Sequence, residues 1–208
     1  MSGPTLRGPY VITDPRLIAP ATLMDVVTRA IEGGAALIQY RHKGQDEALR
    51  RRQAEALVGL CRRHGVPLII NDDLELAARC GADGVHLGRD DVPVAQARRR
   101  LGAEALIGVS CYDELDRALG AEADGADYVA FGSMYPSPTK PGAGRAPLGL
   151  LRQARGRVRI PICAIGGLTV DNAGPVVEAG ADMLAVISAV FATPDPRAAT
   201  ERLAALFG

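Results

Sequence analysis

The sequence predicts a single α/β domain over residues 1–208 that folds as a closed (β/α)8 barrel, a TIM barrel. Three observations lead to this fold class. Short apolar runs alternate with longer amphipathic stretches from one end of the chain to the other. The runs are nearly all apolar, as expected for parallel strands that are buried on both faces. A Gly-Ala motif also recurs four times, where a helical pattern ends and an apolar run begins.

The apolar runs are the predicted strands, and each is only about four residues long. Strands of this length are within the usual range for globular proteins. In chain order they are Tyr10–Thr13, Ala36–Gln39, Leu68–Ile70, Gly84–Leu87, Leu106–Val109, Tyr128–Phe131, Ile162–Ile165 and Met183–Val186.

Amphipathic patterns between these runs predict helices. In Asp46–Arg63, for example, Leu49, Leu57 and Cys61 are interleaved with charged residues, which is typical of a helix with one buried face. The other predicted helices are Leu74–Arg79, Val94–Arg100, Asp113–Glu122, Leu148–Arg155, Val170–Glu178 and Arg197–Leu206. An alternation of strand and helix indicates a parallel sheet.

The recurring motif distinguishes a barrel from an open sheet. It reads Gly34-Ala35-Ala36, Gly81-Ala82-Asp83, Gly125-Ala126-Asp127 and Gly180-Ala181-Asp182. Glycine is the usual left-handed terminator of a helix. The motif precedes every second strand, and a four-fold recurrence over eight βα units favours a closed barrel over a doubly wound sheet.

Composition narrows the classes of function. The chain has 24 basic and 24 acidic residues, no Trp and three Phe, so neither a global basic field nor stacking platforms for nucleic acid are present. No secretory signal or run of 18 apolar residues occurs, so we expect no membrane partner and a cytoplasmic location. The scattered cysteines are predicted to be reduced thiols. A homo-oligomer is left open.

Active sites of such barrels lie just beyond the C-terminal ends of the strands. After the second run, alternation sends Gln39, Arg41 and Lys43 to the same side. Two cations and an amide at a barrel mouth suit a polyanion, although a solvated strand end remains an alternative. Ser110 supplies a hydroxyl after the fifth run, and His86 is favoured as a core or supporting residue.

Acidic residues follow the third and fourth runs. Asp73 is predicted to cap the next helix, which leaves Asp72 facing the mouth, and Asp91 also has a capping alternative. Because Asp72 and Asp91 follow adjacent strands, their carboxylates could share one Mg²⁺, a hard ion that takes one or two carboxylates together with substrate phosphate oxygens. We therefore predict magnesium as the cofactor.

Two further segments suit phosphate groups. The Tyr135–Pro147 loop is rich in hydroxyls, and its Lys140 could neutralise a leaving group. Gly167, after the seventh run, and Ser188, after the eighth, occupy the usual phosphate site of these barrels. A metal-bound diphosphate and a separate monophosphate together imply two small phosphorylated substrates.

The chain resembles the thiamine phosphate synthase family over nearly its full length. The segments that carry the resemblance are Tyr10-Val11-Ile12-Thr13-Asp14, Gln39-x-Arg41-x-Lys43, Ile69-Ile70-Asn71-Asp72, Gly81-Ala82-Asp83-Gly84-Val85-His86-Leu87-Gly88-x-x-Asp91, Gly108-Val109-Ser110, Pro136-Ser137-Pro138-Thr139-Lys140 and Ala164-Ile165-Gly166-Gly167. Ser137 stands where the family often has Thr, and Arg89-Asp90 replaces a commoner Gln-Glu pair.

The resemblance implies a transferase. It would join hydroxymethylpyrimidine diphosphate to hydroxyethylthiazole phosphate, release pyrophosphate and depend on Mg²⁺ held by Asp72 and Asp91. The catalytic residues it implies are Arg41, Lys43, Ser110 and Lys140. The substrate-binding residues are Gln39, Tyr40, Arg41, His42, Lys43, Asn71, Ser110, Ser137, Pro138, Thr139, Lys140, Gly167, Ile187 and Ser188. No protein nucleophile is required, because the chemistry needs a stabilised leaving group and two well-placed rings.

Two alternatives differ from this prediction. A thiazole tautomerase would share the barrel and the monophosphate pocket but would not need the full set of Arg41, Lys43, Asp72, Asp91 and Lys140. A non-catalytic phosphate-sensing barrel would need neither the paired acids nor the lysine loop. Mg²⁺-dependent pyrophosphate release separates all three.

Overall fold

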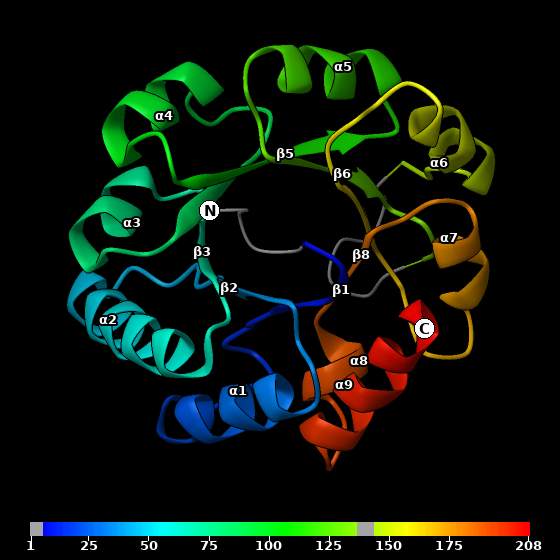
Figure 1. Cartoon of the computed structure of the whole chain (residues 1–208). Helices are drawn as coiled ribbons and strands as arrows, with labels where there is room; N and C mark the ends of the chain where they lie inside the picture. The colour runs from blue at the N-terminus through cyan, green and yellow to red at the C-terminus, as the bar shows by residue number, and fades with distance from the viewer. Residues whose placement is uncertain (1–5, 137–143) are drawn as a thin grey trace.

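The computed structural model describes residues 6–136 and 144–208. Eight parallel strands pair in chain order and close between the last and the first (Figure 1). Helices form a ring around this barrel. The predicted (β/α)8 fold class is therefore confirmed.

The strands lie where the sequence places them, with small differences at their ends. They are β1 (Gly8–Ile12), β2 (Leu37–Tyr40), β3 (Leu68–Asn71), β4 (Gly84–Leu87), β5 (Leu106–Tyr112), β6 (Tyr128–Gly132), β7 (Ile162–Ile165) and β8 (Met183–Val186). The main difference is β5, which continues past Val109. Its pairing with β6 shifts register between Ser110 and Tyr112, and such a bulge redirects the side chains around it.

The helices also follow the prediction, with two additions. They are α1 (Leu23–Glu32), α2 (Glu47–His64), α3 (Leu74–Cys80), α4 (Val94–Leu101), α5 (Leu115–Ala123), α6 (Leu148–Arg155), α7 (Gly174–Glu178), α8 (Ser188–Phe191) and α9 (Pro196–Ala204), with 3-10 turns at Pro20–Thr22 and Ala205–Phe207. Neither α1 nor the single turn α8 is among the predicted helices, and α7 begins later than predicted. No helix in the described ranges is long and apolar enough to cross a bilayer.

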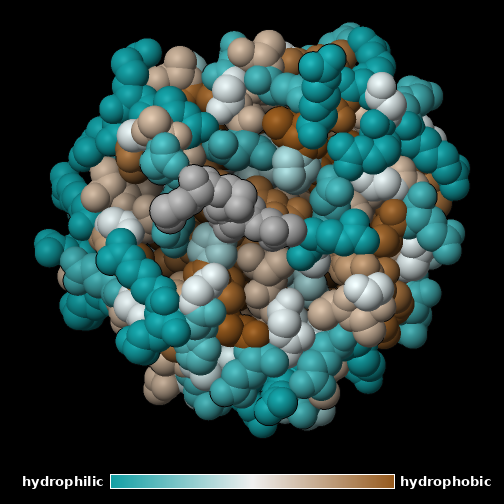
Figure 2. Space-filling model, viewed as in Figure 1, coloured by the Kyte–Doolittle hydropathy of each residue, from teal (hydrophilic) through white to brown (hydrophobic). Residues whose placement is uncertain are grey.

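Alternation along the strands divides the apolar side chains into two clusters. Tyr10, Ile12 and Tyr128 belong to the cluster inside the barrel. Val11 and Val129, their neighbours in sequence, belong to the cluster between strands and helices. In the view of Figure 2, hydrophilic residues predominate around the periphery of the molecule, and more apolar residues show toward its middle. The barrel is thus a packed core whose interior side chains form the floor of anything bound at its mouth.

The recurring Gly-Ala motif lies at the opposite, N-terminal end of the barrel, and three of its four copies read Gly-Ala-Asp, with Asp83, Asp127 and Asp182. The carboxylate of Asp83 accepts a hydrogen bond from Leu68 N of β3. Asp127 accepts in the same way from Ile107 N of β5, and Asp182 from Ile162 N of β7. Each carboxylate therefore accepts from the backbone N–H group of a buried residue near the start of a strand. The motif has a structural role, and the C-terminal end is left to the functional residues.

Candidate functional site

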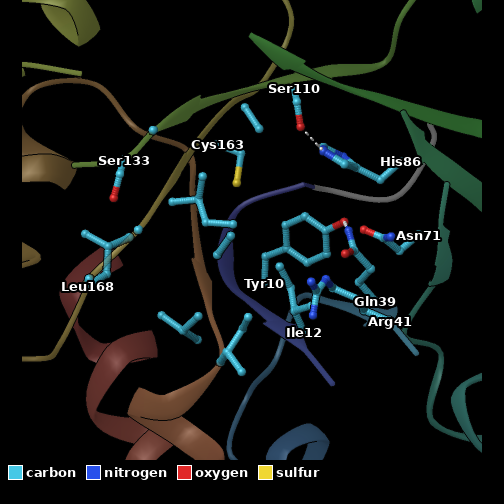
Figure 3. A pocket seen from close by; sticks show the side chains of 18 of the residues that line it. Tyr10, Ile12, Gln39, Arg41, Asn71, His86, Ser110, Ser133, Cys163 and Leu168 are labelled. Carbon is cyan, nitrogen blue, oxygen red and sulfur yellow. Dashed lines mark hydrogen bonds between the residues drawn. The ribbon is translucent and has the colours of Figure 1, made fainter. Parts of the chain in front are cut away.

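A cavity of about 180 Å³ lies at the C-terminal ends of the strands (Figure 3). Ile12, Ala130, Cys163 and Ala185 line it with apolar or weakly polar atoms, and polar side chains line it as well. A cavity of roughly 150 Å³ can hold one benzene ring. The enclosed part is thus sized for one small aromatic ring, with its charged groups toward the open side.

One side of the cavity carries the amide and cations predicted from the second strand. Gln39, Arg41 and Asn71 line it (Figure 3), and Lys43 forms an ion pair with Asp72. Lys43 is 60% exposed, so its ammonium group remains accessible to a ligand. Gln39 lies on β2 and Asn71 on β3, whereas Arg41, Lys43 and Asp72 lie just after these strands.

Tyr40 and His42 do not line this cavity, in contrast to their predicted substrate-binding role. Tyr40 is buried, and its hydroxyl donates to Gln53 Oε1 of α2 at 2.8 Å. The His42 ring stacks on Tyr40, and its Nδ1 accepts a hydrogen bond from Gly44 N. The physical reason is alternation, which turns these two side chains away from the face that carries Gln39 and Arg41.

The predicted metal acids come together. The pKa of Asp91 is raised by partial burial and then by the neighbouring carboxylate of Asp72. The N–H of Gly88, bonded to Asp91 Oδ2 at 2.6 Å, and the Lys43 charge oppose this shift only in part. Asp73 accepts from Leu76 N and caps α3 as predicted. Asp91 caps no helix, because α4 begins after Pro93.

A line of buried polar groups runs beneath the cavity. Gln39 Nε2 donates to Tyr10 Oη, whose oxygen lies 2.7 Å from Tyr128 Oη. His86 Nδ1 is 2.9 Å from Tyr128 Oη, and its Nε2 is 2.8 Å from Ser110 Oγ (Figure 3). Burial raises the pKa of both tyrosines, so they stay neutral. A satisfied buried network is rigid, and this one fixes the side chains of Gln39 and Ser110.

The other side of the cavity is built from segments after β6, β7 and β8. Gly167, Ile187 and Ser188 line it as predicted. Gly166 and Gly167 have φ values of 103° and 63°, which glycine adopts readily. A Cβ atom on Gly166 would lie 2.1 Å from Ser133 Oγ. The glycines are thus also required for packing against the segment after β6.

Several predicted residues lie outside the described ranges. These are Ser137, Pro138, Thr139 and Lys140, whose predicted roles stay predictions.

The structure adds cavity residues that sequence reasoning missed. Tyr10 and Ile12 lie on β1, Tyr112 is the last residue of β5, and Ser133 and Leu168 follow β6 and β7. The inward positions of β1 could have been found from its alternation. Tyr112 could not, because its place depends on the β5 bulge and on a positive φ of 56°.

Paired carboxylates, cations and a ring-sized floor define a (β/α)8 barrel enzyme of phosphorylated substrates. The family model described as thiamine monophosphate synthase matches residues 9–190. The chain is 55% identical to a thiamine-phosphate synthase of Thioalkalivibrio sulfidiphilus, over 99% of this chain and 98% of that protein. It is 56% identical to one of Azoarcus sp., over 99% of both.

Solved structures give the same result. A thiamine phosphate pyrophosphorylase from Pyrococcus furiosus superposes with a TM-score of 0.88 at 37% identity, covering 98% of this chain and 96% of that one. A 3-hexulose-6-phosphate synthase, with a TM-score of 0.70 and 21% identity over 97% of this chain and all of that one, shares the fold. The chain belongs to the thiamine monophosphate synthase family, which confirms the resemblance found in the sequence.

Proposed function

We propose that this protein is a thiamine phosphate synthase that joins a pyrimidine diphosphate to a thiazole phosphate and releases pyrophosphate. The observation that carries the proposal is the arrangement of charge at the barrel mouth. Arg41 lines a cavity whose floor accepts a ring. Lys43, Asp72 and Asp91 lie close to one another just after β2, β3 and β4, at the same end of the barrel. Charge of both signs next to an apolar floor suits a ring that bears a metal-bound diphosphate.

The cations would act on the leaving group. As the bond between the pyrimidine methylene and the diphosphate oxygen breaks, negative charge grows on the diphosphate and positive charge on the pyrimidine. Lys43 and Arg41 would stabilise the growing negative charge, and the thiazole nitrogen would then supply the electron pair for the new carbon–nitrogen bond. Fixed charges of this kind act without reorganisation during the reaction.

The two acids fit Mg²⁺. The pKa of Asp91 is raised by partial burial and in part by the neighbouring Asp72 carboxylate, and a shared cation would relieve the repulsion between the two acids. When bound there, Mg²⁺ would neutralise diphosphate oxygens. Asp72 is oriented for this by its backbone, which has a positive φ of 62° and donates a hydrogen bond to His86 O at 2.9 Å.

The opposite side of the cavity would hold the thiazole phosphate. Gly167, Ile187 and Ser188 line it there, and in barrels of this kind the segments after the last two strands commonly bind phosphate. The two substrates would then meet above the apolar floor. Lys140 and the hydroxyls of Ser137 and Thr139 remain proposed contacts from the sequence.

A test needs the two substrates and a pyrophosphate assay. We expect thiamine phosphate and pyrophosphate in equal amounts, only when Mg²⁺ and both substrates are present, and loss of both products with Asp91→Ala. Equal turnover after chelation of all divalent metal would contradict the magnesium role. Isomerisation of the thiazole alone, without pyrophosphate release, would favour the tautomerase alternative. We further propose that the protein acts in the cytoplasm on these two small molecules.

A further inference from the structure

The Thr13-Asp14 pair after β1 has no role in the site described so far. Both residues are buried, with exposed fractions of 2% and 1%, and neither lines the main cavity. A buried carboxylate is costly unless it is paired. Its partners therefore indicate what it does.

Asp14 is held on one side by Arg16. Its Oδ1 accepts from Arg16 N at 2.9 Å and from Arg16 Nε at 3.0 Å, and its Oδ2 accepts from Arg16 Nη2 at 2.6 Å. These bonds lower the pKa of Asp14, so it is ionised at neutral pH. Forked pairs of this kind fix orientation as well as charge.

The Asp14 oxygen that accepts from Arg16 Nη2 also lies near Arg41. Asp14 Oδ2 lies 3.7 Å from Arg41 Nη1. Thr13 Oγ1 accepts a hydrogen bond from Arg41 N at 2.9 Å, and Thr13 N donates to Gln39 O at 2.9 Å. The backbone N–H and the guanidinium of Arg41 therefore both contact the segment just after β1. Arg41 itself is the first residue after β2.

We propose that Asp14 is a positioning residue that orients the Arg41 guanidinium toward the diphosphate of the substrate, with Thr13 fixing the Arg41 backbone. This inference rests on the proposed function. The Asp14 charge is already balanced by Arg16, so it cancels little of the attraction between Arg41 and an anion. What Asp14 supplies is direction, and a donor held in place loses less entropy on binding.

The probe is inorganic pyrophosphate with Mg²⁺, measured by titration calorimetry on the whole protein. We expect Asp14→Asn, which keeps the side-chain shape, to weaken pyrophosphate binding about tenfold, the loss of one charge-assisted contact. In steady-state kinetics the KM for the pyrimidine diphosphate should rise, and the KM for the thiazole phosphate should not. Asp113→Asn is the matched control, because Asp113 is an exposed carboxylate after β5.

A double-mutant cycle with Arg41→Ala decides the mechanism. If Asp14 acts through Arg41, Asp14→Asn has no further effect on pyrophosphate binding in the Arg41→Ala background. An equal loss in both backgrounds, tighter binding, or an equal rise in both KM values would overturn the inference. Should Asp14→Asn not fold, Arg16→Ala replaces it, since Arg16 is 62% exposed. Weaker pyrophosphate binding by Arg16→Ala then supports the inference, and unchanged binding contradicts it.

Failure of the proposed function can be distinguished from failure of the positioning role. A wild-type protein that makes no thiamine phosphate contradicts the proposed function. A wild-type protein that is active, with no coupling between Asp14 and Arg41, contradicts only the positioning role.

Discussion

At the scale of single residues, the charged side chains at the barrel mouth interact with one another and would also interact with a bound substrate. Lys43 pairs with Asp72, and the same ammonium group also counters the rise in the pKa of Asp91. A substrate diphosphate would compete with these acids for the lysine, while a metal ion would release it. Lys43 is thus placed to change partners when substrate arrives.

Removal of the Lys43 charge tests its place beside the leaving group. We expect Lys43→Ala to lower kcat/KM for the pyrimidine diphosphate about 100-fold, the typical effect of losing one donor to a developing anion. The KM for the thiazole phosphate should stay unchanged. Lys43→Arg keeps the charge and should recover part of the activity. Steady-state kinetics with each substrate varied in turn measures both values, and an equal effect on the two substrates argues against the role.

We predict that the ionised carboxylate of Asp91 lowers the stability of the metal-free protein. Its raised pKa means that folding disfavours the ionised form. The resulting penalty is present at neutral pH, above both the folded and unfolded pKa values, and it disappears as the pH falls through the folded value. In chelator at neutral pH, Asp91→Asn should therefore raise the Tm by no more than about 2–4 °C, or about 1 kcal/mol.

Thermal unfolding with and without metal checks this. The difference in Tm should vanish at acid pH, and it should reverse with saturating Mg²⁺, because only the wild type gains binding energy from the ion. A lower Tm for Asp91→Asn in chelator would show that its bond to Gly88 N outweighs the repulsion from Asp72.

At the scale of elements, the strands and the cap of α3 were predictable because they depend on local sequence. Asp73 caps α3 as expected, and Asp72 and Asp91 meet because adjacent parallel strands end at the same edge. Tyr40 and His42 entered the predicted site through the resemblance and not through alternation, and they do not line the cavity. Their substrate-binding role stays a prediction. The bulge that brings Tyr112 into the cavity depends on pairing with β6, which no local pattern specifies.

The role of the Gly-Ala-Asp motif leads to a prediction about stability. Asp182 Oδ2 accepts from Ile162 N at 2.8 Å and from Arg155 Nη1 at 2.7 Å. Asp182→Ala would leave a buried N–H without a partner, so we expect a loss of about 1–3 kcal/mol in the free energy of unfolding. Denaturant unfolding measures it.

The matched control is Asp124→Ala, at the exposed end of α5 near the same barrel end. It should change stability by less than about 0.5 kcal/mol. The kcat of folded Asp182→Ala should equal that of the wild type, because the motif lies at the end of the barrel away from the site. A loss of kcat without a loss of stability would contradict this structural role.

At the scale of the whole molecule, the barrel is closed by its two ends. β1 pairs with β8, and α1 packs against α9, the deep blue and red helices beside each other in Figure 1. Arg7 Nη2 also donates to Phe207 O at 3.0 Å. Segments near the two ends of the chain, which are far apart in sequence, therefore complete the barrel together.

The contact between α1 and α9 depends on one glycine. Gly33 ends α1 with a φ of −79°, so its backbone conformation does not require glycine. Glycine is required there for lack of space, because a Cβ atom at position 33 would lie 2.4 Å from Arg197 O and 2.8 Å from Thr200 Cβ on α9. Gly33→Ala must push α9 away from α1 or distort α1. Overpacking of this kind lowers the free energy of unfolding by about 1–3 kcal/mol.

Gly120→Ala is the same change at a site without that constraint. Gly120 lies within α5, where an added Cβ meets nothing within 4 Å, so alanine should stabilise the protein by about 0.5–1 kcal/mol through its higher helix propensity. The two variants should therefore shift the denaturant midpoint in opposite directions. If Gly33→Ala were also stabilising, the contact between α1 and α9 would be looser than the structure shows. Closure of the barrel would then not depend on the close approach of these two helices.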